Sequence, residues 1–145
     1  MEEVVNNKPI DWTFTNPDGV TSVSAQGRVH TGNFAVNIVN GSAISQTVSV
    51  STGGCFYDFS FFARGEESQV GFTATVTFDT TTGPVTGATI TVRQQDLSTY
   101  NGQFQFFRTT TTQAPINTTA ITVTILVDAE GSQSLDLDDV SLTVD

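Results

Sequence analysis

Short segments of alternating apolar and polar residues, separated by turn signals, run along the whole chain. The turn signals are Asn-Pro-Asp-Gly at 16–19, Asn-Gly at 40–41 and 101–102, Thr-Gly-Gly at 52–54 and Thr-Thr-Gly-Pro at 81–84. Alternation with a period of two places every second side chain on the same face of a strand. No segment carries apolar residues at helical spacing over three turns. The pattern predicts an all-β antiparallel sandwich or barrel in which any helix is a single turn.

The same alternation predicts the strands and the core. The expected strands span residues 12–14, 21–24, 34–38, 43–50, 56–63, 69–79, 88–96, 102–109, 120–128 and 135–144. Their apolar faces predict a core built around Phe59, Phe61, Phe72, Val76, Phe78, Phe104, Phe106, Val123 and Ile125. The opposite faces are rich in Thr. Among the threonines they carry Phe62, Gln105, Phe107 and Leu126.

Length and charge limit the classes of partner. The 145 residues suit one β-sandwich domain over 1–145, which we expect to be part of a longer surface or secreted protein. Five basic residues against fifteen acidic ones give a net charge of -10, which repels nucleic acid and anionic membranes. No apolar run is long enough to span a bilayer, and the N-terminus lacks the pattern of a signal peptide. The single Cys55 excludes an internal disulfide and is predicted to be a small buried side chain.

The alternation slips by one residue near the end of the chain. Leu135 and Leu137 share one register, whereas Val140, Leu142 and Val144 follow the opposite one. Between them stand two adjacent aspartates, Asp138 and Asp139. One extra residue at this point would return the apolar side chains to the core, so the slip predicts a β-bulge at the aspartate pair.

Five segments, read in order, resemble the galactose-binding-like jelly-roll domains. They are DWTF at 11–14, VHTGNFAVNI at 29–38, ISQTVSVSTGGCFYDFSFFARG at 44–65, TTQAPINTTAITVTI at 111–125 and LDLDDVSL at 135–142. Within that group the chain resembles the carbohydrate-binding modules of bacterial glycosidases and the N-terminal domains that precede collagen-like repeats in spore-forming bacteria. The resemblance implies a two-sheet antiparallel sandwich of jelly-roll type. It also implies sugar binding, a structural calcium ion, or a role as a coat or adhesion domain.

Catalysis is not indicated. The only histidine, His30, lies in an expected turn where the resembling domains use this position for packing and hydrogen bonding. No nucleophile stands beside it in a recognisable motif. We therefore expect a non-catalytic domain that binds a glycan through an open sheet face or through the loops at the sandwich edge.

Aromatic and planar polar side chains on the expected open face are the candidates for sugar binding, because a pyranose needs a ring to pack on and hydrogen bonds for its hydroxyls. They are Phe62, Arg64, Arg93, Gln94, Gln95, Tyr100, Gln105 and Phe107. The single Trp12 is expected to pack between the sheets. If these residues bind the sugar, we expect Arg64, Arg93, Tyr100 and Gln105 to converge on one groove; otherwise the site would lie in the edge loops near ARGEES at 63–68 and DLSTYNG at 96–102.

The resemblance implies one structural Ca²⁺ at the aspartate pair. Asp138 or Asp139 would supply a carboxylate and the turn at 30–33 backbone carbonyls. The resembling modules often add a Glu from the N-terminal segment before the Trp. The sequence NNKPIDW at 6–12 has no such Glu, so Asp11 or Asn7 would take its place. The alternative is that both aspartates only stabilise the bulge.

A structural or adhesive role is the alternative function. Phe62, Phe107 and Leu126 on a Thr-rich face would then form an apolar patch for a partner or for a homo-oligomer. Under either function we expect an extracellular location or the surface of a bacterial cell or spore.

Overall fold

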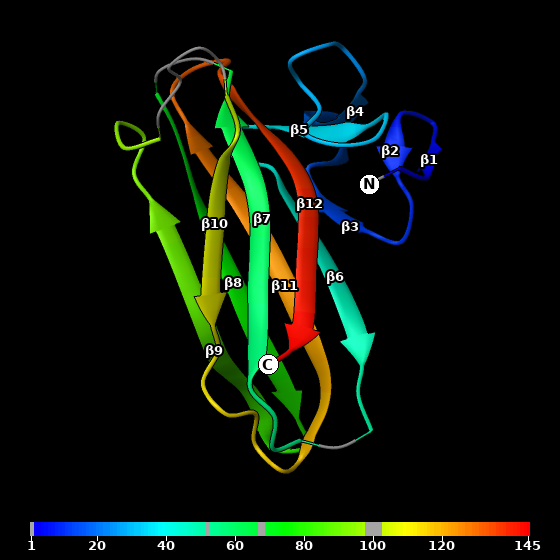
Figure 1. Ribbon diagram of the computed structural model, residues 1–145, viewed down its shortest axis with the longest axis vertical. Helices are drawn as coiled ribbons and strands as arrows, with labels where there is room; N and C mark the ends of the chain where they lie inside the picture. The colour runs from blue at the N-terminus through cyan, green and yellow to red at the C-terminus, as the bar shows by residue number, and fades with distance from the viewer. Residues whose placement is uncertain (1, 52, 67–68, 98–102) are drawn as a thin grey trace.

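In the computed structural model the chain forms two five-stranded antiparallel sheets packed face to face (Figure 1). The structure describes residues 2–51, 53–66, 69–97 and 103–145. The strands are β1 (Val4–Val5), β2 (Lys8–Pro9), β3 (Thr13–Thr15), β4 (Val20–Val23), β5 (Ala35–Val39), β6 (Ala43–Ser49), β7 (Tyr57–Gly65), β8 (Val70–Thr80), β9 (Gly83–Val92), β10 (Gln105–Thr110), β11 (Thr118–Ala129) and β12 (Ser134–Val144), with one 3₁₀ turn at Pro17–Gly19. The fold class is confirmed, and among the described residues helix is limited to this single turn.

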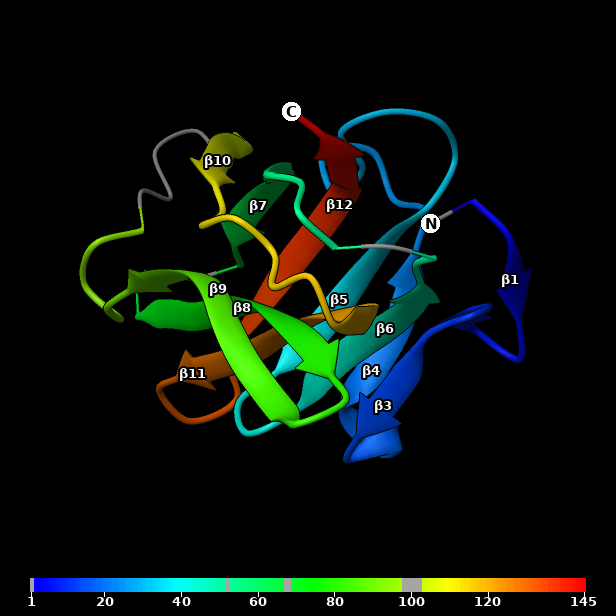
Figure 2. The same cartoon turned by 90° about the horizontal axis from the view of Figure 1, so that it is seen from below.

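The chain crosses repeatedly between the two sheets, as in a jelly roll. One sheet has the order β10-β7-β12-β5-β4 and is called the β7 sheet; the other has the order β3-β6-β11-β8-β9 and is called the β8 sheet. Figure 2 shows the two layers from the end of the sandwich. From β6 onward the strands alternate between the sheets, except that β8 and β9 are consecutive neighbours in one of them. A small two-stranded ribbon, β1-β2, precedes the sandwich and was not predicted.

The core lies between the inward faces of the two sheets. Phe59, Phe61, Phe72 and Phe78 are fully buried, together with the predicted aliphatic residues of β8 and β11. Trp12 and Cys55 are partly buried and pack against this core. None of the described helices is long and apolar enough to cross a membrane.

The predicted faces of β10 are wrong. Pairing with β7 sets Phe106 opposite Phe62 and Phe107 opposite Phe61, so Phe107 shares the inward face of the sheet. Phe107 packs on the buried rings of Phe61 and Phe72, with ring centroids 5.4 and 5.1 Å away. Phe104 and Phe106 were both predicted for the core, but Phe106 is 55% exposed and Phe104 is partly buried with its ring against His30. Gln105 pairs with inward-facing Ala63. Because Phe104, Phe106 and Phe107 lie within four positions, the alternation allows either face of β10 to point to the core. Only the pairing with β7 decides which face does.

The predicted β-bulge is present in β12. Asp138 pairs with Phe62 and Ser141 with Ser60, so three steps along β12 match two steps along β7. Asp139 has a φ of 53°, a left-handed conformation that Asp tolerates better than most residues. The bulge returns Val140 and Leu142 to the core side, where both pack against the buried cluster.

Candidate functional site

Aromatic rings gather on the outer face of the β7 sheet. Phe62 of β7 and Phe106 of β10 lie with ring centroids 4.8 Å apart. The imidazole of His30 stacks on Phe62 at 3.6 Å with an interplanar angle of 15°, and Phe104 meets it edge-on at 5.6 Å. These four residues form a platform, the aromatic cluster, whose most exposed ring is that of Phe106.

The bulge in β12 holds His30 over this face. The carboxylate of Asp138 is buried, and its Oδ2 accepts hydrogen bonds from the backbone N–H groups of His30 and Thr31 at 2.9 and 3.2 Å. The Asp139 carboxylate lies 2.6 Å from both His30 Nδ1 and Thr31 Oγ1. The aspartate pair therefore fixes the turn at 30–31 and positions the imidazole ring against Phe62.

A buried ion-pair network lies beside the aromatic cluster. Asp136 of β12 is fully buried and forms a bidentate pair with Arg28, with both N···O distances at 3.1 Å. Arg64 of β7 bonds Asp136 and Glu66, and Asn37 donates to Asp136 at 2.9 Å. Burial on its own raises the pKa of Asp136, but the hydrogen bonds from Arg28 and Asn37 outweigh it and lower that pKa. Arg64, a predicted sugar-binding residue, is thus largely engaged inside the protein.

Polar side chains lie beside the aromatic cluster on the outer face of the β7 sheet. Arg108 of β10 donates to Asp58 of β7 at 2.9 Å, and Thr110 donates to the other oxygen of Asp58 at 2.8 Å. The hydrogen bonds from Thr110 and Arg108 lower the pKa of Asp58. Ser60 and Ser141 face each other across β7 and β12 in the row beside Arg108. An exposed aromatic ring therefore lies next to fixed hydrogen-bonding groups on one surface.

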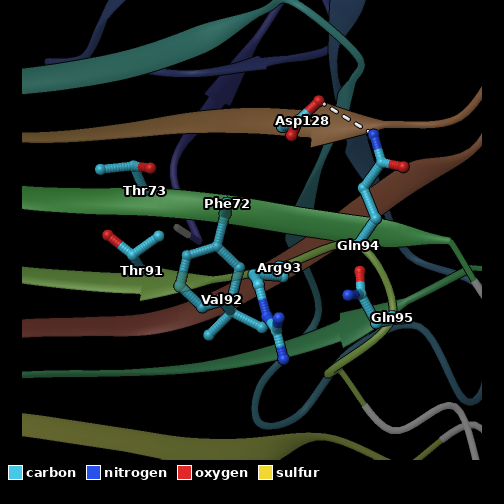
Figure 3. A pocket seen from close by; sticks show the side chains of 8 residues that line it. All are labelled: Phe72, Thr73, Thr91, Val92, Arg93, Gln94, Gln95 and Asp128. Carbon is cyan, nitrogen blue, oxygen red and sulfur yellow. Dashed lines mark hydrogen bonds between the residues drawn. The ribbon is translucent and has the colours of Figure 1, made fainter.

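The outer face of the β8 sheet is built differently. Thr13, Ser45, Thr124, Thr75 and Thr89 form one row of hydroxyl side chains across all five strands. Thr47 and Thr122 bond to each other in the next row, with their hydroxyl oxygens 2.9 Å apart. This face presents mainly small hydroxyl side chains, and Leu126 of β11 is 45% exposed on it, so Leu126 does not share a patch with Phe62 of the β7 sheet as predicted. At one end of the face lies an open pocket of about 430 Å³. The pocket includes Arg93 and Gln95 (Figure 3).

The structure separates the predicted sugar-binding residues. Phe62 and Arg64 are on the β7 sheet, whereas Arg93, Gln94 and Gln95 follow β9 of the β8 sheet. Gln105 and Phe107 share the inward-facing side of β10, as described above, and Tyr100 lies outside the described residues. The expected convergence of Arg64, Arg93 and Gln105 on one groove is therefore wrong. Alternation gives the face of each strand but not the sheet to which the strand belongs.

Several site residues were not identified from the sequence. Phe106 was assigned to the core, and Arg108, Asp58 and Arg28 were given no role in binding. His30 was expected to be structural, and its hydrogen bonds agree with that, but its ring also extends the aromatic surface. The only sequence signal for this arrangement was the slip at Asp138 and Asp139, which marked the bulge that holds His30.

Asp138 and Asp139, the predicted calcium ligands, have hydrogen-bond partners within the protein. Both oxygens of Asp138 and of Asp139 accept hydrogen bonds from N–H or O–H groups or lie against the His30 ring nitrogen. Asp11 lines a separate pocket with Glu2, Glu3 and Trp12. The described part of the chain contains no group of three His, Cys, Asp or Glu side chains suited to a metal ion. The calcium site stays a prediction.

The N-terminal segment does place a Glu at the predicted turn. Glu2 accepts hydrogen bonds from the backbone N–H groups of Asn33 and Phe34 at 2.7 and 3.2 Å. These two bonds lower the pKa of Glu2. The sequence predicts Asp11 or Asn7 in this role, because the segment at 6–12 contains no Glu, whereas in the structure Glu2 reaches the turn.

The fold is shared with solved carbohydrate-binding modules, although no protein-family model and no curated protein matches the sequence. A family 61 carbohydrate-binding module in complex with β-1,4-galactotriose superposes with a TM-score of 0.73 at 18% identity, covering 96% of this chain and 92% of that one. The chain has the jelly-roll fold of these modules.

Two structures of xylan-related proteins also share this fold. The family 22 module and catalytic module of Clostridium thermocellum xylanase 10B, complexed with xylohexaose, matches with a TM-score of 0.66 at 19% identity. That match covers 93% of this chain and 26% of the longer xylanase chain. A family 22 xylan-binding domain matches with a TM-score of 0.63 at 16% identity, over 96% of this chain and 90% of that one. The predicted jelly-roll resemblance is confirmed at the level of the fold.

Proposed function

We propose that this domain is a non-catalytic glycan-binding module whose ligand lies across the outer face of β10, β7 and β12. The observation that carries the proposal is the exposed ring of Phe106, packed on Phe62 and flanked by the Arg108–Asp58 pair. A pyranose ring presents an apolar face of C–H groups that packs on an aromatic surface, and its hydroxyls need fixed donors and acceptors. The outer face of the β7 sheet supplies both.

The structural neighbours support this function because three of them are or contain carbohydrate-binding modules: one in complex with β-1,4-galactotriose, one in a two-module xylanase chain complexed with xylohexaose, and one a xylan-binding domain. Fold alone does not determine function, so the proposal rests on the side chains of the β7 sheet. The net charge of -10 favours a neutral glycan over an anionic one, since an acidic polymer would be repelled. Binding of this kind fits an extracellular or cell-surface location, which also stays a proposal.

Calorimetry with β-1,4-galactan and xylan oligosaccharides tests the proposal. Phe106→Ser should reduce affinity at least tenfold while lowering the melting temperature by only a few degrees. Ile116→Ser is the control, because Ile116 is 86% exposed and lies in the loop before β11, outside the aromatic cluster. Equal binding by the wild type and Phe106→Ser would overturn the assignment of the site.

Size-exclusion chromatography with light scattering separates this function from the adhesive alternative. If the same surface served for self-association, its apolar centre would be Phe62 and Phe106, because Phe107 faces the core. An oligomer that Phe106→Ser converts to a monomer, with no glycan bound by either protein, would favour that alternative.

A further inference from the structure

The pocket at the end of the β8 sheet is formed by a close approach of the backbone. After β9 ends at Val92, residues 93–95 cross over β8 at Gly71. A Cβ atom at position 71 would lie 2.4 Å from the Val92 carbonyl oxygen and 2.8 Å from the Gln94 nitrogen. Only glycine allows this approach, so the position of the segment that forms the pocket rim is fixed by the backbone.

Hydrogen bonds also fix the polar side chains of the rim. Gln94 reaches across to β11 and donates from Nε2 to Asp128 Oδ1 at 3.0 Å, as the dashed line in Figure 3 shows. Arg93 donates from Nε and Nη2 to the two carboxylate oxygens of Asp96 at 2.7 and 3.3 Å. The Asp96 N–H closes this turn by donating to the Arg93 carbonyl at 2.9 Å. The planar groups are thus oriented before any ligand binds.

Hydrogen-bonding capacity remains within the pocket. Thr73, Thr91 and Gln95 line it, and their side chains make no hydrogen bond to other described residues. In Figure 3 the two threonines lie at one side of the pocket and Gln95 at the other. Hydroxyl and amide groups act as both donors and acceptors, the combination that sugar hydroxyls require. The volume of about 430 Å³ is in the range of small-molecule sites.

Charge narrows the class of ligand. The guanidinium of Arg93 is neutralised by Asp96, and Asp128 adds a negative charge on the opposite side. An anionic ligand would therefore meet a carboxylate as well as a compensated arginine, whereas a neutral polyol meets no such penalty. Among the described residues that line the pocket, Phe72 carries the one aromatic ring, and this ring is buried in the core, so hydrogen bonds from these residues rather than stacking would hold the ligand.

We infer that this pocket is a second carbohydrate site, which binds one neutral sugar residue at a chain end or branch. It lies on the β8 sheet, on the opposite face of the sandwich from the aromatic cluster. The inference goes beyond the proposed function, because two sites that face away from each other bind two glycan chains at once. One domain can then cross-link chains or bind a branched polymer with increased avidity.

NMR titration of the ¹⁵N-labelled domain with the methyl glycosides of galactose, xylose and glucose tests the inference. On addition of sugar, the amide resonances of residues 71–73, 91–96 and 128 should change their chemical shifts. These chemical-shift changes should persist in Phe106→Ser and disappear in the Arg93→Ala/Gln95→Ala double variant. Thr75→Ala is the matched control, since Thr75 belongs to the same face but does not line the pocket. Methyl glucuronide, which is anionic, should cause smaller shifts than methyl glucoside.

The outcomes distinguish the two sites. Shifts confined to residues around 58, 62, 106 and 108 would overturn the second site and leave the proposed function intact. Shifts confined to the pocket would support the second site and contradict the binding face on the β7 sheet. Shifts that survive the double variant, or no shifts with any of the sugars, would overturn the inference.

Discussion

Phe106 and Phe107 are adjacent in β10, yet their rings lie on opposite sides of the β7 sheet. Phe106 contacts Phe62 on the outer face, and Phe107 contacts Phe61 and Phe72 in the core. Two residues of the same type thus have different roles, one in the candidate binding surface and one in stability. This pair provides a direct comparison by mutation.

Replacing each phenylalanine by alanine should separate stability from binding. Phe107→Ala removes a ring packed on two buried rings and should cost about 3 kcal/mol of unfolding free energy. Phe106→Ala should cost less than about 1 kcal/mol, because the ring is already more than half exposed. Urea denaturation of both variants measures the difference, and equal losses would contradict the register of β10.

The carboxylate of Asp138 in the bulge should stabilise the fold, because it accepts hydrogen bonds from backbone N–H groups. Asp138→Ala leaves the N–H groups of His30, Thr31 and Asp139 without their acceptor, a loss of about 1–3 kcal/mol. Asp18→Ala is the control, because Asp18 is exposed in the 3₁₀ turn, and its effect should stay within about 0.5 kcal/mol. Thermal and urea melts that coincide for the two variants would show that the bulge does not depend on this carboxylate.

Acid should weaken the ion-pair network at Asp136. Its lowered pKa means that the folded state binds fewer protons at this carboxyl than the unfolded state does. The resulting stabilisation is complete above the ordinary Asp pKa of about 3.9 and is lost as the pH falls through the lower folded value. The unfolding free energy should therefore fall less in Asp136→Asn than in the wild type between about pH 5 and pH 2.5. If the unfolding free energies of the wild type and Asp136→Asn fall in parallel with pH, the lowered pKa of Asp136 is contradicted.

The calcium prediction requires a stability change that depends on the ion. A ligand that binds only the folded state raises its stability, by about 2.7 kcal/mol at one hundred times the Kd. Calcium should then raise the melting temperature relative to chelator in the wild type, and Asp139→Asn should remove the difference. Identical melts of the wild type in calcium and in chelator would leave the aspartates with only their observed role, which is to hold the turn at His30 and Thr31.

Strand positions and the bulge were predictable because they depend on local patterns. The alternation in Phe72, Ala74, Val76 and Phe78 has only one apolar register, and the slip at Asp138 has only one economical explanation. The register of β10 was not predictable, since Phe104, Phe106 and Phe107 offer two possible apolar faces. Its pairing with β7 decides the matter, and that pairing is a long-range property.

The candidate site was predicted only in part for the same reason. Phe62 was correctly placed on an outer face. Arg93 and Gln95 were predicted within a strand at 88–96, but β9 ends at Val92 and both residues follow it. Their assignment to a different sheet from Phe62 depends on topology. The network at Asp136 joins residues 28, 64 and 136, which are brought together only when β7 and β12 pair. Contacts of such long sequence separation leave no local pattern.

The last strand of the chain occupies the middle of the β7 sheet. β12 lies between β7 and β5, and without it the two halves of the sheet have no hydrogen-bonded connection to each other. During synthesis the β7 sheet cannot close until the residues of β12, 134–144, have left the ribosome, so the edges of β5 and β7 that β12 covers stay unpaired until then. Cooperative folding of the sandwich must therefore follow, rather than accompany, the synthesis of these residues.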